Sequence, residues 1–240
     1  MPRYKIADIV FSVELLYDYT KWLCRDYEYN GDEKDEFKLK VEKEDVLNEM
    51  KNLPDFPDYF VESVFVYRKL CEHALEVANG LIFHCSAIMV DDGAYLFTAP
   101  SGTGKSTHTR LWRELLGDKA VMINDDKPII RLVDDKIYIY GTPWTGKHEL
   151  GENIKVPLKA ICKLSRGKEN KIRRADEKQM ITTLFNQTMR PNDLKKAEVL
   201  FEITDKILSD VKLYDLECNI SVESAKLSYE TMKKGKFYED

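Results

Sequence analysis

The chain has 240 residues, of which 43% are hydrophobic and 33% are charged, as in an ordinary folded protein. Its formal net charge of −5 is mild, and basic residues are interspersed with acidic ones, which argues against a nucleic-acid-binding surface. No stretch is apolar enough to predict a membrane-spanning helix, and the first residues lack the uninterrupted apolar core of a secretory signal. We therefore expect a cytoplasmic protein with neither a membrane nor a nucleic-acid partner.

The cysteines are odd in number, widely spaced and without a C-x-x-C pair. In a cytoplasmic protein this pattern predicts reduced thiols rather than disulfides or metal ligands. The thiols in question are those of Cys24, Cys71, Cys85, Cys162 and Cys218.

Residues 1–62 are predicted to form a small, strand-rich N-terminal subdomain. The segment 36–42 (EFKLKVE) alternates apolar and charged residues, which is the pattern of a half-buried strand. The polar segment 30–36 (NGDEKDE) is rich in turn-forming residues and predicts a connection between strands rather than an acidic binding tail.

Residues 63–240 are predicted to form the main α/β domain. Apolar residues at helical spacing indicate a helix over 62–79, and the next apolar segment, 80–90, is expected to be one strand. The part after residue 168 is expected to be mostly helical. Further expected elements are a strand at 94–99, a helix at 105–117, strands at 120–124 and 156–167, a hairpin at 128–141, a strand at 212–218 and a helix at 222–234.

A glycine-containing loop lies between the expected strand 94–99 and helix 105–117. It reads Ala-x-x-x-x-Gly-Lys-Ser, with Ala99 where this pattern usually has glycine. Glycines let successive backbone N–H groups turn toward phosphate oxygens, and the positive end of the helix adds to that field. The sequence thus predicts a nucleotide-binding loop made of Ser101, Gly102, Thr103, Gly104, Lys105, Ser106 and Thr107.

Two residues of this loop carry specific expectations. Lys105 is expected to reach the β- and γ-phosphates, and the hydroxyl of Ser106 is expected to bind a metal ion. ATP and Mg²⁺ are therefore the predicted cofactors.

An acidic pair, Asp125 and Asp126, directly follows the expected strand 120–124. In a parallel arrangement this strand would end at the same edge of the sheet as the loop. Adjacent residues of an extended chain point to opposite sides, so one carboxylate is expected to face the metal and the other an attacking hydroxyl.

Taken together, three segments resemble the kinase domain of HPr kinase/phosphorylase, and most closely the shorter HPr-kinase-like proteins of the phosphoenolpyruvate carboxykinase-like superfamily. They read FHCSAIMVDDGAYLFTAPSGTGKSTHTRLW, AVMINDDKPII and YGTPWTGKHELGENIKVPLKAICKL, and the resemblance covers about residues 80–165. It implies a P-loop kinase core with a mixed sheet, a small N-terminal subdomain and a helical C-terminal part. The implied activity is ATP- and Mg²⁺-dependent transfer of the γ-phosphate to a hydroxyl, with serine as the expected acceptor group, on a peptide, protein or small molecule.

The same resemblance implies roles for individual residues. Asp125 is expected to act as the base toward the hydroxyl, assisted by the strand histidine His84, with Lys105 at the transferred phosphate. Asp126 and Ser106 are expected to support the metal. The family also implies a homo-oligomer.

The chain departs from the family pattern after the acidic pair, because the Glu-x-Arg-Gly segment is missing. Glu149 or Glu152 would have to replace its glutamate, Lys147 would add positive charge, and Trp144 would exclude water. This departure, with the basic flank of the loop, argues against phosphorylase activity and against HPr as the acceptor. Two alternatives stay open at this point: a carboxykinase-type lyase and a nucleotide-gated binding protein without catalysis.

Overall fold

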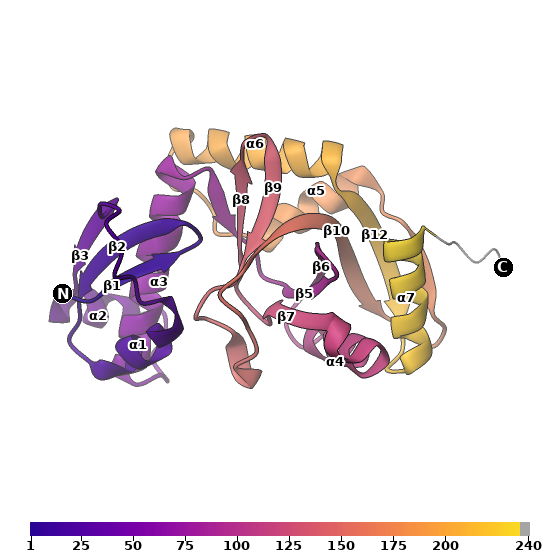
Figure 1. Cartoon of the computed structure of the whole chain (residues 1–240), viewed down its shortest axis with the longest axis horizontal. Coiled ribbons are helices and arrows are strands. Elements are labelled where there is room, and N and C mark those ends of the chain that lie inside the picture. Colours follow the sequence, from indigo (N-terminus) through magenta and orange to yellow (C-terminus); the bar gives the residue numbers. More distant parts are fainter. Residues whose placement is uncertain (236–240) are drawn as a thin grey trace.

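The computed structural model of the chain describes residues 1–235 and contains two sheets flanked by helices (Figure 1). A three-stranded sheet belongs to the N-terminal part, and a curled, mixed, nine-stranded sheet forms the rest. The molecule is thus a mixed α/β protein with a small N-terminal sheet. Residues 236–240, at the end of the predicted main domain, lie outside the described part.

The N-terminal sheet has the order β1-β2-β3, with β2 antiparallel to β1 and parallel to β3. Ala7 and Asp8 form the tight turn between β1 and β2, both with positive φ (53° and 60°). Helices are inserted between and after these strands, so this part is less strand-rich than its alternating sequence indicates. The elements are β1 (Arg3–Ile6), β2 (Ile9–Glu14), α1 (Asp18–Leu23), η1 (Arg25–Tyr27), β3 (Phe37–Lys40) and α2 (Lys43–Met50).

Helix α3 (Asp58–Val77) joins the two sheets. Its apolar residues, among them Val61, Phe65 and Leu70, belong to the same buried cluster as β1 and β2. Glu62 is fully buried and accepts hydrogen bonds from the backbone N–H of Leu16 (2.6 Å) and the hydroxyl of Thr20 (3.1 Å). The predicted subdomain limit at residue 62 therefore falls inside a helix that packs against the N-terminal sheet.

The nine-stranded sheet has the order β4-β8-β9-β10-β6-β5-β7, with β12 beside β10 and β11 beside β12. The long strand β10 pairs with β9 through its first residues and with β6 and β12 through its remainder. The strands are β4 (Gly80–Ile82), β5 (Ser86–Val90), β6 (Gly93–Thr98), β7 (Ala120–Asn124), β8 (Ile129–Val133), β9 (Lys136–Tyr140), β10 (Lys155–Arg166), β11 (Lys171–Arg174) and β12 (Lys212–Cys218).

Strand direction places two ends at one edge. β5 is antiparallel to both β6 and β7, so β6 and β7 run in the same direction although they are not neighbours. Their carboxyl ends, which lead into the glycine loop and the acidic pair, therefore lie at one edge of the sheet. The expected arrangement holds, with an antiparallel strand inserted between the two.

Helices cover both faces of this sheet (Figure 1). Side chains of β6 alternate: Tyr95 and Phe97 pack with α4 and α7, whereas Ala94 and Leu96 pack with α5 and α6. Such two-sided burial explains why the strand is apolar throughout. The helices are α4 (Lys105–Leu116), α5 (Glu177–Asn186), α6 (Leu194–Asp210) and α7 (Val222–Lys234), with short turns η2 (Gly117–Lys119) and η3 (Gly146–His148).

The apolar segment 80–90 is not one strand, as its composition predicts, but two. β4 pairs with β8 while β5 pairs with β6 and β7, so the chain changes partners at residues 83–85. Backbone hydrogen bonds from Phe83 to Pro128 (3.2 Å) and from His84 to Gln187 (2.8 Å) hold this crossing. His84 therefore lies in a connection, not in a strand. The short strand β11 was also not predicted.

No helix within residues 1–235 combines the length and the apolar character needed to cross a membrane. The five cysteines carry free thiols, four of them buried and the fifth, Cys218, half-buried.

Trp112 on α4 anchors one face of the sheet. It is fully buried, its indole N–H donates to Ser228 Oγ of α7 (2.8 Å), and its ring meets those of Phe97 and Tyr229 edge-on. Removing a side chain of this size leaves a cavity and two unsupported rings.

We expect Trp112→Ala to lower the free energy of unfolding by about 3–5 kcal/mol. Urea denaturation followed by circular dichroism measures this. The control is Trp22→Ala, because Trp22 is 47% exposed on α1; its cost should stay below about 1 kcal/mol. Equal costs for the two variants would contradict the assigned packing.

Candidate functional site

The glycine loop connects β6 to α4 through two residues with left-handed backbone. Gly102 has φ +78° and Gly104 has φ +127°, and a Cβ at either position would meet nothing within 4 Å. The backbone conformation therefore favours glycine at both positions, although neighbouring residues leave space for a side chain. Ala99 is buried in the core under the loop, which a methyl side chain fits.

Lys105 begins α4 and folds back over the loop. Its Nζ donates to the carbonyl oxygen of Ala99 (3.0 Å), and the residue is only 7% exposed. Burial lowers the pKa of this ammonium, while Cys85, Asp126 and Asp125 act in the opposite direction. The loop therefore presents a positive group, held in place, beside the acidic pair.

Asn124 fixes the chain where β7 ends. Its Oδ1 accepts hydrogen bonds from the backbone N–H groups of Asp126 (2.8 Å) and Lys127 (2.6 Å). Its Nδ2 donates to the carbonyl and hydroxyl oxygens of Thr142 (3.0 and 3.1 Å). The buried amide thus fixes the backbone of the turn at Asp126 and Lys127, a role that the sequence did not reveal.

Asp125 points toward the glycine loop and is 6% exposed. Ser86 Oγ donates to its Oδ1 at 2.5 Å, and the Ser106 hydroxyl acts to lower the pKa of this carboxyl. Burial nevertheless raises the pKa of this carboxyl above its ordinary value. Asp125 is therefore a poorly solvated carboxylate beside the expected metal-binding serine.

Asp126 faces the connection that carries His84. Its Oδ1 lies 3.3 Å from His84 Nε2, and the other ring nitrogen, Nδ1, lies 2.8 Å from Gln187 Oε1 at the end of α5. Burial acts to raise the pKa of Asp126, but the hydrogen bond from His84 and the charges of Lys127 and Lys105 outweigh it, and the pKa is lowered. A Gln–His–Asp chain results.

One cavity of about 420 Å³ brings these groups together. We call it the loop cavity. Its lining contains almost every residue that the sequence predicted for the site, together with a segment around η3 that was predicted only through Lys147. The lining residues are His84, Ser101, Gly102, Gly104, Lys105, Ser106, Thr107, Asp125, Asp126, Gly146, Lys147 and His148.

Four residues considered from sequence lie elsewhere. Thr103 is not among the residues lining the loop cavity; its hydroxyl donates to the Pro100 carbonyl (2.8 Å). Glu149 lines a small neighbouring pocket, and Glu152 is exposed. Trp144 is buried in the N-terminal core, with its ring centroid 4.6 Å from that of Tyr67, so it does not wall the cavity.

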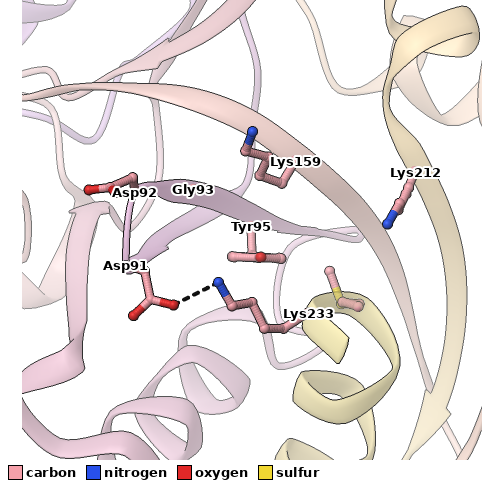
Figure 2. A pocket seen from close by; sticks show the side chains of 8 residues that line it. Asp91, Asp92, Gly93, Tyr95, Lys159, Lys212 and Lys233 are labelled. Carbon is pink, nitrogen blue, oxygen red and sulfur yellow. Dashed lines mark ion pairs between the residues drawn. The ribbon is translucent and has the colours of Figure 1, made fainter. Parts of the chain in front are cut away.

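Another cavity, of about 370 Å³, lies around the turn between β5 and β6 (Figure 2). This turn begins β6, whereas the glycine loop follows the other end of that strand. Asp91 is paired with Lys233 at 2.7 Å, and Tyr95 lies between this pair and Lys159. The predicted site residues all belong to the opposite edge of the sheet.

Hard oxygen donors in the loop cavity suit Mg²⁺. Asp125 and Ser106 supply a carboxylate and a hydroxyl to the lining of the same cavity, and Mg²⁺ in nucleotide-dependent transferases usually takes one or two such ligands together with phosphate oxygens. Within residues 1–235 there is no group of three or more His, Cys, Asp and Glu side chains that could hold a metal ion on its own.

Comparisons with known proteins give a distant structural likeness. No protein-family model and no curated protein sequence matches the chain. Among solved structures, the Hpr(Ser) kinase/phosphatase from Coxiella burnetii is similar, with a TM-score of 0.35 and 12% sequence identity over 64% of this chain and 94% of that one. So low a similarity adds nothing about activity, and the residues of the loop cavity carry the proposal below.

The two aspartates should affect stability in opposite directions. When folding raises the pKa of a carboxyl, the free energy of unfolding falls as the pH rises above the ordinary pKa of 3.8. Ionised Asp125 therefore lowers the stability of the protein at pH 7. A carboxyl whose pKa is lowered, such as Asp126, contributes stability above pH 3.8 that is lost as the pH falls.

Asp125→Asn should therefore raise the melting temperature at pH 7, and Asp126→Asn should lower it. Thermal denaturation without nucleotide or metal measures both, and at pH 3 the two differences from the parent protein should shrink. Shifts of the same sign at pH 7 would contradict the contacts described for these carboxyls.

Proposed function

We propose that the chain is an ATP- and Mg²⁺-dependent kinase that transfers the γ-phosphate to a hydroxyl, with a serine side chain as the preferred class of acceptor. The single observation that carries the proposal is the loop cavity. In it a positive, glycine-containing loop at a helix N-terminus faces a buried carboxylate and a histidine–aspartate pair. An anion-binding loop opposite groups that can accept a proton is what phosphoryl transfer to a hydroxyl requires.

The loop supports the phosphate half of the reaction. Gly102 and Gly104 turn the backbone ahead of α4, whose N-terminal N–H groups and dipole favour an anion. Lys105 adds a full positive charge at the same place. Such fixed groups stabilise charge that develops on the transferred phosphoryl group without having to reorganise.

The contacts of the aspartates favour a different division of roles from the one that the family resemblance implies. Asp125 and Ser106 line the loop cavity together, and the Ser106 hydroxyl acts to lower the pKa of Asp125, so these two residues would hold Mg²⁺, which supplies positive charge at the β- and γ-phosphates when bound. Asp126 is paired with His84, whose other nitrogen is held by Gln187. We assign the acceptor hydroxyl to this pair.

The lining of the loop cavity also bears on the lyase alternative. Apart from Lys105 of the glycine loop, the lining contains the ammonium group of Lys147, and it contains no arginine. A dicarboxylate such as oxaloacetate is best recognised by paired guanidinium groups. The described cavity therefore favours transfer to a hydroxyl.

Lys105→Met should weaken the binding of Mg²⁺·ATP roughly 100-fold, because a charge-assisted contact to phosphate is lost. Isothermal titration calorimetry measures this. The matched control is Lys159→Met, a lysine of the cavity shown in Figure 2, which should bind as the parent does. Unchanged affinity in Lys105→Met would remove the loop from the proposed site.

Substitution of the two aspartates separates their roles. Asp126→Asn should keep the affinity for Mg²⁺·ATP within about threefold and slow phosphoserine formation about 100-fold or more, as expected for loss of a proton acceptor. Asp125→Asn should instead abolish the difference in ATP affinity with and without Mg²⁺.

The assay combines labelled ATP with a mixture of serine-containing peptides, and mass spectrometry locates the phosphate. The reverse pattern, in which Asp125→Asn binds normally without transfer, would restore the family assignment. Transfer at the parent rate in both variants would overturn the kinase proposal.

A further inference from the structure

We propose that a second cavity, which adjoins the loop cavity, binds the nucleoside part of the nucleotide. This inference rests on the proposed function, because it presupposes that the glycine loop holds the phosphates. The adjoining cavity has a volume of about 430 Å³, within the usual range for small-molecule sites. It lies between the glycine loop, the end of β10 and the connection from β12 to α7.

The two cavities share part of the glycine loop. Gly102, Gly104 and Thr107 line both of them. A ligand whose phosphates lie on one side of this loop can therefore continue into the other cavity. The acceptor-side residues His84 and Asp126 line only the loop cavity, so the two ends of the reaction would not compete for space.

The interior of the adjoining cavity is mainly apolar. Leu111 of α4 and Leu164 of β10 are buried and contribute to its lining. Ile220 also lines this cavity and is 77% exposed, so its side chain is available to cover a ligand. A flat base placed between buried leucines and this isoleucine would cover apolar surface on both sides of its ring.

Hydrogen bonds within the protein link the segments that form the walls of the adjoining cavity. Arg166 Nη2 donates to the Gly102 carbonyl (2.6 Å), which links the end of β10 to the glycine loop. The N–H of Gly167 donates to the Cys218 carbonyl (3.0 Å), and Asn219 Nδ2 donates to the Lys168 carbonyl (3.1 Å). A ligand here meets a preformed site, which reduces the entropic cost of binding.

The nitrogen-containing side chains of His108 and Arg166, which line the adjoining cavity, already have partners within the protein, which suits a neutral base rather than a second anion. His108, which contributes to the lining, is 3% exposed, and its Nε2 is hydrogen-bonded to Ser228 Oγ at 2.9 Å. The guanidinium of Arg166 is engaged by loop carbonyls.

The test compares two ligands on the full chain by calorimetry, both with Mg²⁺: ATP, and inorganic tripolyphosphate, which has the phosphate chain without a nucleoside. The parent should bind ATP about tenfold or more tightly than tripolyphosphate. Ile220→Asn should weaken ATP binding roughly fivefold and leave tripolyphosphate binding unchanged.

Val222→Asn is the matched control, because this aliphatic residue is also exposed (44%), follows two positions later and does not line the cavity. It should bind both ligands as the parent does. Equal affinities of the parent for ATP and tripolyphosphate, or equal losses of both in Ile220→Asn, would overturn this inference and leave the kinase proposal standing. Failure of the parent to bind either ligand would overturn both.

Discussion

The insertion of β5 between β6 and β7 is the constraint on which the candidate site depends. Because β5 runs antiparallel to both neighbours, the glycine loop after β6 and the acidic pair after β7 emerge at one edge. The start of β5 also brings Ser86 to Asp125 and leaves His84, two residues earlier, facing Asp126. The start of this strand thus contacts one carboxylate, and the connection just before it contacts the other.

Holding these charged groups together costs stability, and the surrounding hydrogen bonds offset part of that cost. Asp125 and Lys105 are nearly buried, and burial opposes the charged form of each. Asn124 ties the backbone of the acidic turn to Thr142, so the carboxylates cannot relax into solvent without breaking buried hydrogen bonds. Buried charged groups with shifted pKa values are more typical of functional sites than of residues that only stabilise a fold.

The sequence predicted the local features of the site and missed those that depend on distant segments. The loop, its helix and the strand before Asp125 are set by neighbouring residues, and they occur where expected. Ser86, Gln187 and His148 were not predicted, because nothing near them in the chain indicates their contacts; Gln187 lies 103 residues from its partner His84. The change of strand partner within residues 80–90 could not be predicted, because β4 and β5 are both buried and therefore have the same apolar composition.

The N-terminal part shares its interior with the large sheet. Ile129, Tyr140 and Trp144 belong to the same buried cluster as β1 and β2, and Asp8 binds the Tyr140 hydroxyl (2.7 Å) and the Lys155 ammonium (2.9 Å). Tyr67 of α3 donates to the carbonyl of Lys127, immediately after the acidic pair (3.3 Å). Versions of the protein that begin at α3 would expose Tyr67, Tyr140 and Trp144 to water, so the residues before α3 complete an interior that the large sheet cannot close alone.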